Sequence, residues 1–256
     1  MCGDPSSPNA EPADRGDACS PRETCEQCKY WAEDHSTSVS GQSSKYNDSS
    51  QWGDLPVRFK FDVRLAGGEV VVSFVCKWNT VEGDPPLTQA MKTEIKDALT
   101  TTVPTFWSNQ HSLKIADPIC GEKTLPIRVK VTWDDSGANA IAVNLQKAER
   151  RSSAHALSMN LDYDDDIKDN AWVLKHEFGH VLANHDEYHY AGKTAETITL
   201  KRANGSTETL NLEPPANVMI TPGSTKVEKR HLYFVEIEAQ ELLRRKSGRN
   251  ITCEIV

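Results

Sequence analysis

Alternation of apolar and polar residues predicts β-strands along much of this 256-residue chain. Residues 57–65 (VRFKFDVRL) alternate as a half-buried strand does, and residues 68–78 (GEVVVSFVCKW) follow a Gly67-Gly68 turn, which predicts a hairpin. The same reasoning predicts further strands at 126–133, 140–145, 155–161, 196–202 and 206–212. Asn204-Gly205 separates the last two, which is a strong hairpin signal.

Helical spacing appears in three segments. In residues 87–103, apolar residues recur at i, i+4 positions, which indicates an amphipathic helix. Residues 171–183 (AWVLKHEFGHVLA) are apolar nearly all round, which is typical of a buried helix, and residues 227–246 predict a final helix. Because strands precede the second helix and a helix closes the chain, the pattern predicts a single α+β domain over residues 55–256.

Residues 1–54 differ from the rest of the chain and are expected to form a Cys-containing leader or linker. Residues 36–50 are rich in serine and nearly free of apolar side chains, which favours flexibility. Four of the seven cysteines lie in the first 28 residues: Cys2, Cys19, Cys25 and Cys28. These cysteines could form disulfides in an oxidising compartment, remain free thiols, or supply half of a zinc knuckle through Cys25 and Cys28.

Charge and hydropathy exclude several functional classes. The formal net charge of −8 argues against a nucleic-acid-binding protein, which would usually carry a basic face. No apolar run approaches the roughly 20 residues that a helix needs to span a bilayer. The first residues lack the basic and apolar regions of a secretory signal peptide, so we expect a cytosolic protein, export by another route, or a piece of a longer chain.

The predicted buried helix contains a possible metal site. His176 and His180 lie four residues apart, so their side chains project from one face of the helix and can share one zinc ion. Glu177 can face a water bound to that ion and accept its proton. Because burying unpaired polar groups costs a few kcal/mol each, a metal and its water would satisfy all three side chains. We therefore expect zinc with a catalytic Glu177.

The third zinc ligand is open among several carboxylates. Asp186 can reach the ion only if the helix ends and the chain turns back, and Asn184 can adopt the left-handed conformation that ends a helix. Glu187 is adjacent and equally able to bind zinc. Glu236 or Glu238 on the final helix would take this role if the motif helix ran on.

Four further features have candidate roles. Tyr188 and His231 could stabilise the oxyanion of a tetrahedral intermediate, although a packed aromatic or a helix-start residue is the simpler role for each. The acidic run at 162–166 could bind calcium, but it also complements the dipole of the following helix. The strand at 155–161 is expected to be an edge strand that pairs with an extended substrate.

The segment from His176 to Asp186 (HEFGHVLANHD) resembles the metzincin motif HExxHxxGxxH/D of the zincin metallopeptidases. Ala183 stands where that motif has glycine. Residues 215–222 (PANVMITP) look like the metzincin Met-turn, with Met219 beneath the metal. The resemblance covers residues 171–245 and implies a zincin-like fold with a mixed sheet, an active-site helix and a C-terminal helix. It also implies zinc as cofactor, with Asp186 at the third-ligand position.

The same segment, with its Asp186-Glu187-Tyr188 ending, is similar to metallopeptidase toxin domains of bacterial polymorphic toxins and type VI secretion spike proteins. This resemblance implies a zinc peptidase that acts as an antibacterial effector in a target cell's periplasm, made in the producer's cytoplasm. A protein or peptide substrate, a secretion-apparatus carrier and an immunity protein would be its partners. Two alternatives are a zinc amidase acting on peptidoglycan and a non-catalytic zinc-binding module.

Overall fold

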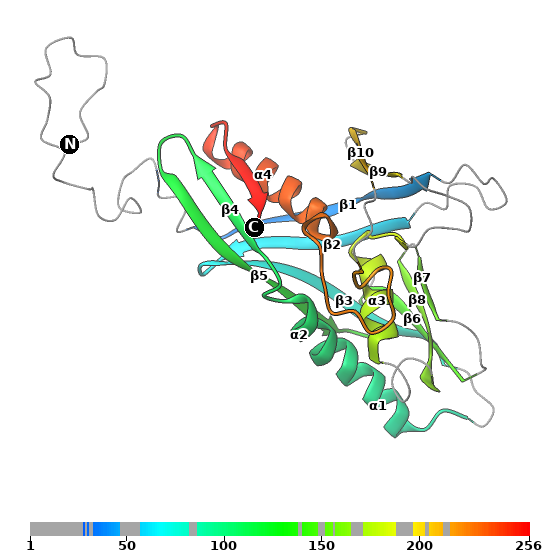
Figure 1. Cartoon of the computed structure of the whole chain (residues 1–256). Coiled ribbons are helices and arrows are strands. Elements are labelled where there is room, and N and C mark those ends of the chain that lie inside the picture. The colour runs from blue at the N-terminus through cyan, green and yellow to red at the C-terminus, as the bar shows by residue number, and fades with distance from the viewer. Residues whose placement is uncertain are drawn as a thin grey trace, which may run out of the picture.

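The chain folds as an α+β domain in which helices cover one face of a mixed sheet (Figure 1). The structure is a computed structural model. It describes residues 28, 30, 33–46, 57–81, 86–137, 140–147, 152–155, 157–164, 171–187, 197–202, 205–211 and 216–256. Among these residues, no helix combines the length and the apolar character needed to cross a membrane.

The sheet has eleven strands in the described part of the chain. They are β1 (His35–Tyr46), β2 (Val57–Ala66), β3 (Glu69–Val81), β4 (Ser112–Asp117), β5 (Gly121–Trp133), β6 (Ile141–Gln146), β7 (Ser153–His155), β8 (Ser158–Asp162), β9 (Thr197–Arg202), β10 (Thr207–Asn211) and β11 (Thr252–Ile255). The helices are α1 (Gln89–Asp97), a π-helical turn (Ala98–Thr102), α2 (Val103–Trp107), α3 (Ala171–Val181), a 3-10 turn (Lys229–Leu232) and α4 (Tyr233–Ser247).

The sheet forks at β3. Its main path runs β10-β9-β1-β2-β3-β5-β4-β11, and a branch of β6, β8 and β7 leaves from the second half of β3. Cys76 pairs with both Trp133 of β5 and Ile141 of β6, so these strands flank opposite edges of β3 at that residue. The pairs β3–β5, β3–β6 and β6–β8 are parallel and the others are antiparallel, which confirms the predicted mixed sheet.

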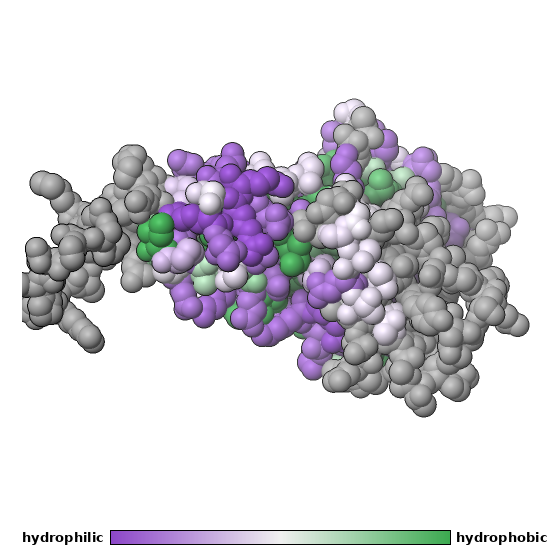
Figure 2. All heavy atoms as spheres, turned by 90° about the horizontal axis from the view of Figure 1, so that it is seen from above, coloured by the Kyte–Doolittle hydropathy of each residue, from purple (hydrophilic) through white to green (hydrophobic). Residues whose placement is uncertain are grey.

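The alternation of buried and exposed strand residues explains why helices cover one face of the sheet. Val70, Val72 and Phe74 of β3 are buried, and the ring of Phe74 meets Phe178 of α3 edge to face. The strand residues that alternate with the buried ones form the opposite face, where Ser38 and Asp62 are exposed. α4 packs on β1, β2 and β11. Figure 2, which looks down on α4, shows a largely hydrophilic surface with small, separated hydrophobic areas.

Side-chain amides connect the strands of the branch. Asn79 donates to Asn144 (2.8 Å), Asn144 donates to Asn160 (2.9 Å), and Asn160 donates to Ser153 (3.3 Å). This chain of hydrogen bonds crosses β3, β6, β8 and β7 in order. It supplements the backbone pairing that holds β7 beside α3.

The predicted helix at 87–103 is longer in the structure. Thr88 caps its start, and buried side chains continue the i, i+4 row through Val103 to Trp107. The final helix is preceded by the 3-10 turn and starts at Tyr233, and α3 begins at Ala171 as predicted. Apolar alternation did not reveal β4 and β11. The expected strand at 155–161 is divided between β7 and β8, and β8 is paired on both sides.

Cys28, Tyr30 and residues 33–46 belong to the sheet domain, although the sequence places them in a leader. β1 lies between β2 and β9, and both pairings are antiparallel. The prediction of flexibility is therefore wrong for residues 36–46, and the expected boundary at residue 55 is too late. Backbone hydrogen bonds to two neighbours order this strand although it is rich in serine, and Val39 supplies a buried apolar anchor.

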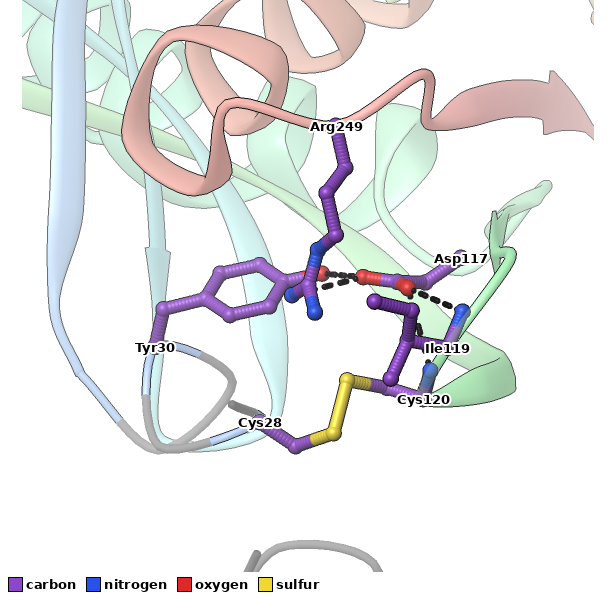
Figure 3. Close-up of a disulfide and its surroundings, with 6 residues drawn as sticks. All are labelled: Cys28, Tyr30, Asp117, Ile119, Cys120 and Arg249. Carbon is purple, nitrogen blue, oxygen red and sulfur yellow. Dashed lines mark hydrogen bonds and ion pairs between the residues drawn. A yellow bond between two sulfur atoms is a disulfide. The ribbon is translucent and has the colours of Figure 1, made fainter. Parts of the chain in front are cut away.

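A disulfide between Cys28 and Cys120 ties the start of the described chain to the turn between β4 and β5 (Figure 3). This confirms a disulfide for Cys28 and excludes it from a zinc knuckle, while Cys2, Cys19 and Cys25 lie outside the described residues. Beside the disulfide, the buried Asp117 accepts hydrogen bonds from Tyr30 and from the backbone N–H groups of Ile119 (2.8 Å) and Cys120 (3.0 Å).

Arg249 completes this group of side chains. Its guanidinium pairs with Asp117 at 3.0 Å and lies over the ring of Tyr30 (Figure 3). We call Tyr30, Asp117 and Arg249 the Asp117 cluster. Burial would raise the pKa of Asp117, but the hydrogen bonds from Tyr30 and the backbone, together with the charge of Arg249, lower it below its usual value.

Candidate metal site

The two histidines of α3 are oriented by backbone carbonyl groups. His176 Nδ1 lies 2.9 Å from the carbonyl oxygen of Val218, and His180 Nδ1 lies 2.7 Å from that of Asn184. A carbonyl can only accept, so Nδ1 carries the proton in both rings. The Nε2 lone pairs are therefore left to bind a metal, which is the usual arrangement of metal-binding histidines.

Asp186 lies where a third ligand is needed. Its Oδ1 is 2.9 Å from His176 Nε2 and 3.5 Å from His180 Nε2. Donors that share a tetrahedral zinc ion with bonds of 2.0–2.1 Å lie about 3.3 Å apart. Donor atoms of the three residues all lie within 4.8 Å of one another, and they form the only such group of metal-ligating side chains in the described residues. The residues present thus fit zinc.

The chain turns back after α3 at Ala183. Ala183 itself has the left-handed conformation, with φ of 76°, so the expectation that Asn184 takes this conformation is wrong. Asn184 instead closes the helix end, because both its backbone N–H and its side-chain amide donate to the carbonyl of Gly179. Alanine therefore occupies, at an energetic cost, the position where glycine would be relaxed.

Glu177 faces the group formed by His176, His180 and Asp186 but is not part of that group. Its Oε2 lies 3.9 Å from His180 Nε2 and is buried with no hydrogen-bond partner among the described residues. The backbone N–H of Ala154 in β7 also donates to this carboxylate. Burial raises the pKa of Glu177, while the neighbouring imidazoles oppose the shift. A buried carboxylate with an open oxygen can act as a proton acceptor beside the cluster.

Asp186 and His180 shift each other's pKa. Burial would lower the pKa of His180, but the hydrogen bond and the charge of Asp186 outweigh it and raise that pKa to about 9, so zinc binding would release a proton from Nε2. Burial would raise the pKa of Asp186, but hydrogen bonds from His176 and His180 hold it well below its usual range. Asp186 is therefore an anion at neutral pH, as a metal ligand must be.

The segment expected to be a Met-turn forms a tight turn under α3. Asn217 Oδ1 accepts the N–H of Met219 (2.8 Å), and the Asn217 carbonyl accepts the N–H of Ile220 (3.1 Å). The Met219 side chain packs against Gly179 so closely that a Cβ atom there would overlap its sulfur. Gly179 thus permits the close approach of the Met219 side chain, and we call residues 217–219 the Met219 turn.

Glu187 points away from the metal-ligand cluster. Its carboxylate accepts hydrogen bonds from Asn217 Nδ2 (2.7 Å) and from Arg230 Nε (2.8 Å) and Nη2 (2.6 Å). His231 Nε2 lies 3.1 Å from Glu187 Oε1. We call Glu187, Asn217, Arg230 and His231 the Glu187 cluster. Burial would raise the pKa of Glu187, but the hydrogen bonds from His231 and Arg230 lower it to about 2.

These contacts decide among the candidate ligands. Glu187 is not brought to the histidines, because both its carboxylate oxygens are held by the Glu187 cluster. Glu236 accepts the N–H of Ile255 in β11 (2.9 Å), and neither it nor Glu238 joins the metal-ligand cluster. Of the carboxylates considered, only Asp186 is placed to complete a site with His176 and His180.

The structure bears on only one of the two candidate transition-state stabilisers, His231 and Tyr188. His231 is buried, and both its ring nitrogens are engaged: Nε2 with Glu187, and Nδ1 as acceptor of the Glu228 N–H (3.1 Å). It cannot donate to an oxyanion at the metal, so that prediction is wrong. Tyr188 lies outside the described residues.

Among the described residues, Asp162 and Asp164 belong to no group of possible metal ligands. Asp162 Oδ1 accepts the N–H of Asp164 (3.1 Å), which is a local turn. Asp165 and Asp166 lie outside the described residues.

Sequence reasoning missed Asn217 and Arg230. A signal did exist, because a carboxylate that follows a buried helix needs a basic or amide partner. Nothing in the sequence shows that these two partners lie 30 and 43 residues downstream of Glu187. Comparison of the chain with protein-family models, with curated proteins and with solved structures finds no match.

Proposed function

We propose that the protein is a zinc-dependent peptidase. The observation that carries the proposal is the placement of Asp186 Oδ1 at 2.9 Å and 3.5 Å from the Nε2 atoms of His176 and His180, with Glu177 beside them. When bound, zinc would lower the pKa of a coordinated water to about 7 and polarise the substrate carbonyl.

Glu177 acts as general base and then as general acid. Its open oxygen accepts the proton of the attacking water and delivers it to the leaving amine. Burial supports this role, because the raised pKa of Glu177 brings its basicity closer to that of the water. An intact general base also argues against a module that merely binds zinc.

β7 supports a substrate with an extended backbone. It contacts α3, its Ala154 N–H donates to Glu177, and it pairs only with β8 in the described part of the chain. A peptide could add to the other edge of β7 and place its scissile bond beside Glu177. This arrangement favours a protein or peptide substrate, and hydrolysis of peptidoglycan amides remains the alternative to be tested.

The disulfide supports action in an oxidising compartment. Disulfides such as Cys28–Cys120 persist in secreted and periplasmic proteins. We therefore keep the proposal of an antibacterial effector, made in a producer's cytoplasm and delivered to a target periplasm, with a secretion carrier and an immunity protein as partners. This biological role depends on the resemblance of residues 171–245 and on the proposed activity.

The test combines metal content with hydrolysis. Purified protein should bind one zinc ion, and Glu177→Gln should keep the ion while its hydrolysis of protein substrates falls by about 10²–10⁴-fold. Substoichiometric zinc, or full activity of Glu177→Gln, would refute the proposal. A parallel panel of peptidoglycan fragments distinguishes a peptidase from a cell-wall amidase.

A further inference from the structure

We propose that Glu187 is a positioning residue that fixes the third zinc ligand by tying it to the turn that also orients the first. The inference rests on the zinc site proposed above. It assigns the Glu187 cluster a role in metal affinity that is separate from its role in the stability of the fold.

The Met219 turn contacts both ends of the ligand set. The Val218 carbonyl accepts the Nδ1 proton of His176 (2.9 Å). The next carbonyl, that of Met219, accepts the backbone N–H of Glu187 (3.0 Å), which directly follows Asp186. The first and third ligands are therefore fixed against neighbouring carbonyl groups of a single turn.

The Glu187 side chain strengthens this connection. Asn217 donates to Glu187 through Nδ2 and accepts the Met219 N–H through Oδ1, so it joins the carboxylate to the turn. Consecutive Cα atoms are about 3.8 Å apart, so a shift of Glu187 moves Asp186 with it. A displacement of about 1 Å would take Asp186 Oδ1 out of bonding range of an ion held by the two histidines.

Arg230 and His231 hold Glu187 from the 3-10 turn that precedes α4. Arg230 makes two charge-assisted hydrogen bonds to the two carboxylate oxygens, a geometry that fixes direction as well as distance. His231 donates through Nε2, and the N–H of Glu228 holds its Nδ1. The partners are themselves restrained, so the carboxylate has one position and Asp186 is held before any ion binds.

The Asp117 cluster provides a matched control. It too is a buried carboxylate paired with an arginine and hydrogen-bonded to neighbouring groups, but it lies beside the disulfide, and the hydrogen bonds and ion pair described for it join Tyr30, the β4–β5 turn and Arg249. Glu187→Gln and Asp117→Asn make the same change, since each neutralises the carboxylate and keeps its shape. A role limited to stability predicts similar consequences for both variants.

The experiment measures the zinc affinity of each folded protein, starting from the metal-free full chain in competition with a chromophoric chelator. Glu187→Ala should weaken zinc binding by about 10–100-fold, as removal of groups that orient metal ligands does. Glu187→Gln, which still accepts from Asn217, should show a smaller loss, and the absorption spectrum of bound Co²⁺ should change in both. Asp117→Asn should keep the wild-type affinity and spectrum.

Two results would overturn the inference: zinc affinity within about 3-fold of wild type in both Glu187 variants, or an equal loss in Asp117→Asn. If Glu187→Ala does not fold, Glu187→Gln alone decides, with Asp117→Asn as its control. Wild-type protein that binds no zinc would refute the proposed function itself. Wild-type binding that the Glu187 variants retain would refute only the positioning role.

Discussion

The Asp117 and Glu187 clusters are built alike and serve different parts of the molecule. In each, a buried carboxylate pairs with an arginine from the last 30 residues, Arg249 or Arg230, and a ring nitrogen or hydroxyl adds a further hydrogen bond. The Asp117 cluster accompanies a covalent link that closes a sequence separation of 92 residues. The Glu187 cluster accompanies a set of metal-ligating side chains. The same ionic arrangement therefore stands beside a covalent link in one region and beside the possible metal ligands in the other.

The largest expected effect is a difference in how zinc changes the free energy of unfolding of variants at the metal site and at the Asp117 cluster. Free zinc at 1,000 times its Kd should raise the free energy of unfolding of the wild type by about 4 kcal/mol. Asp186→Ala should lose this increment because it removes a ligand, whereas Glu236→Ala and Asp117→Asn should keep it. Urea unfolding with and without zinc measures the difference. A zinc response retained by Asp186→Ala would move the third ligand to another residue.

Breaking the disulfide should affect stability and leave the zinc site intact. Replacing both Cys28 and Cys120 with serine should lower the free energy of unfolding by about 2–4 kcal/mol, because the open chain has more conformational entropy when unfolded. Chelator competition should give an unchanged zinc Kd. A reductant should destabilise the wild type but not the double variant, and a weaker zinc affinity in the double variant would show that the two regions are coupled.

Acid should weaken the Asp117 cluster in a defined direction. The pKa of Asp117 is lowered in the folded protein, so its contribution to stability is present above the unfolded pKa of about 3.9 and is lost as the pH falls towards the folded value. The stability difference between wild type and Asp117→Asn should therefore be largest near neutral pH and shrink below about pH 4. Urea midpoints from pH 7 to pH 3 test this, and a constant difference would contradict it.

The smallest expected effect concerns the turn before Asp186. Ala183→Gly should raise the free energy of unfolding by about 1 kcal/mol, because glycine takes the left-handed conformation without the steric cost that alanine bears. Thermal unfolding of metal-free protein provides the measurement. Ala239→Gly, in the buried interior of α4, should instead destabilise. A loss of stability in Ala183→Gly would mean that the buried methyl group matters more than the backbone strain.

The candidate site was predictable where local spacing determines geometry. Residues four apart share a helix face, so the spacing alone placed His176 and His180 together. The apolar residues of α3 indicated that the motif is buried. The choice of Asp186 needed the turn, and its left-handed residue proved to be Ala183, because propensity alone favoured asparagine. The partners of Glu187 could not be predicted, since the strands predicted between Glu187 and Arg230 do not specify which later residues pack beside Glu187.

The fold, too, was predictable where local spacing determines structure and not where it depends on pairing between distant segments. Alternation of apolar residues located β2, β3 and β6, because buried residues alternate with more exposed ones along each strand. β1 escaped prediction, since it is ordered by pairing with β2 and β9 more than by its side chains. β11 escaped because it is short and its partner, β4, was itself not expected.

The pairing of β1 with β9 has a consequence for the order of events during synthesis. Residues 41–46 must wait for residues 197–202, and Glu187 must wait for Arg230 and His231, so these contacts need the last quarter of the 256-residue chain. A ribosome releases the N-terminal end first, and such long-range pairings form slowly. The nascent polypeptide therefore carries its HExxH helix from the synthesis of Val181 until Arg230 and His231 are added, before the partners that complete the site exist.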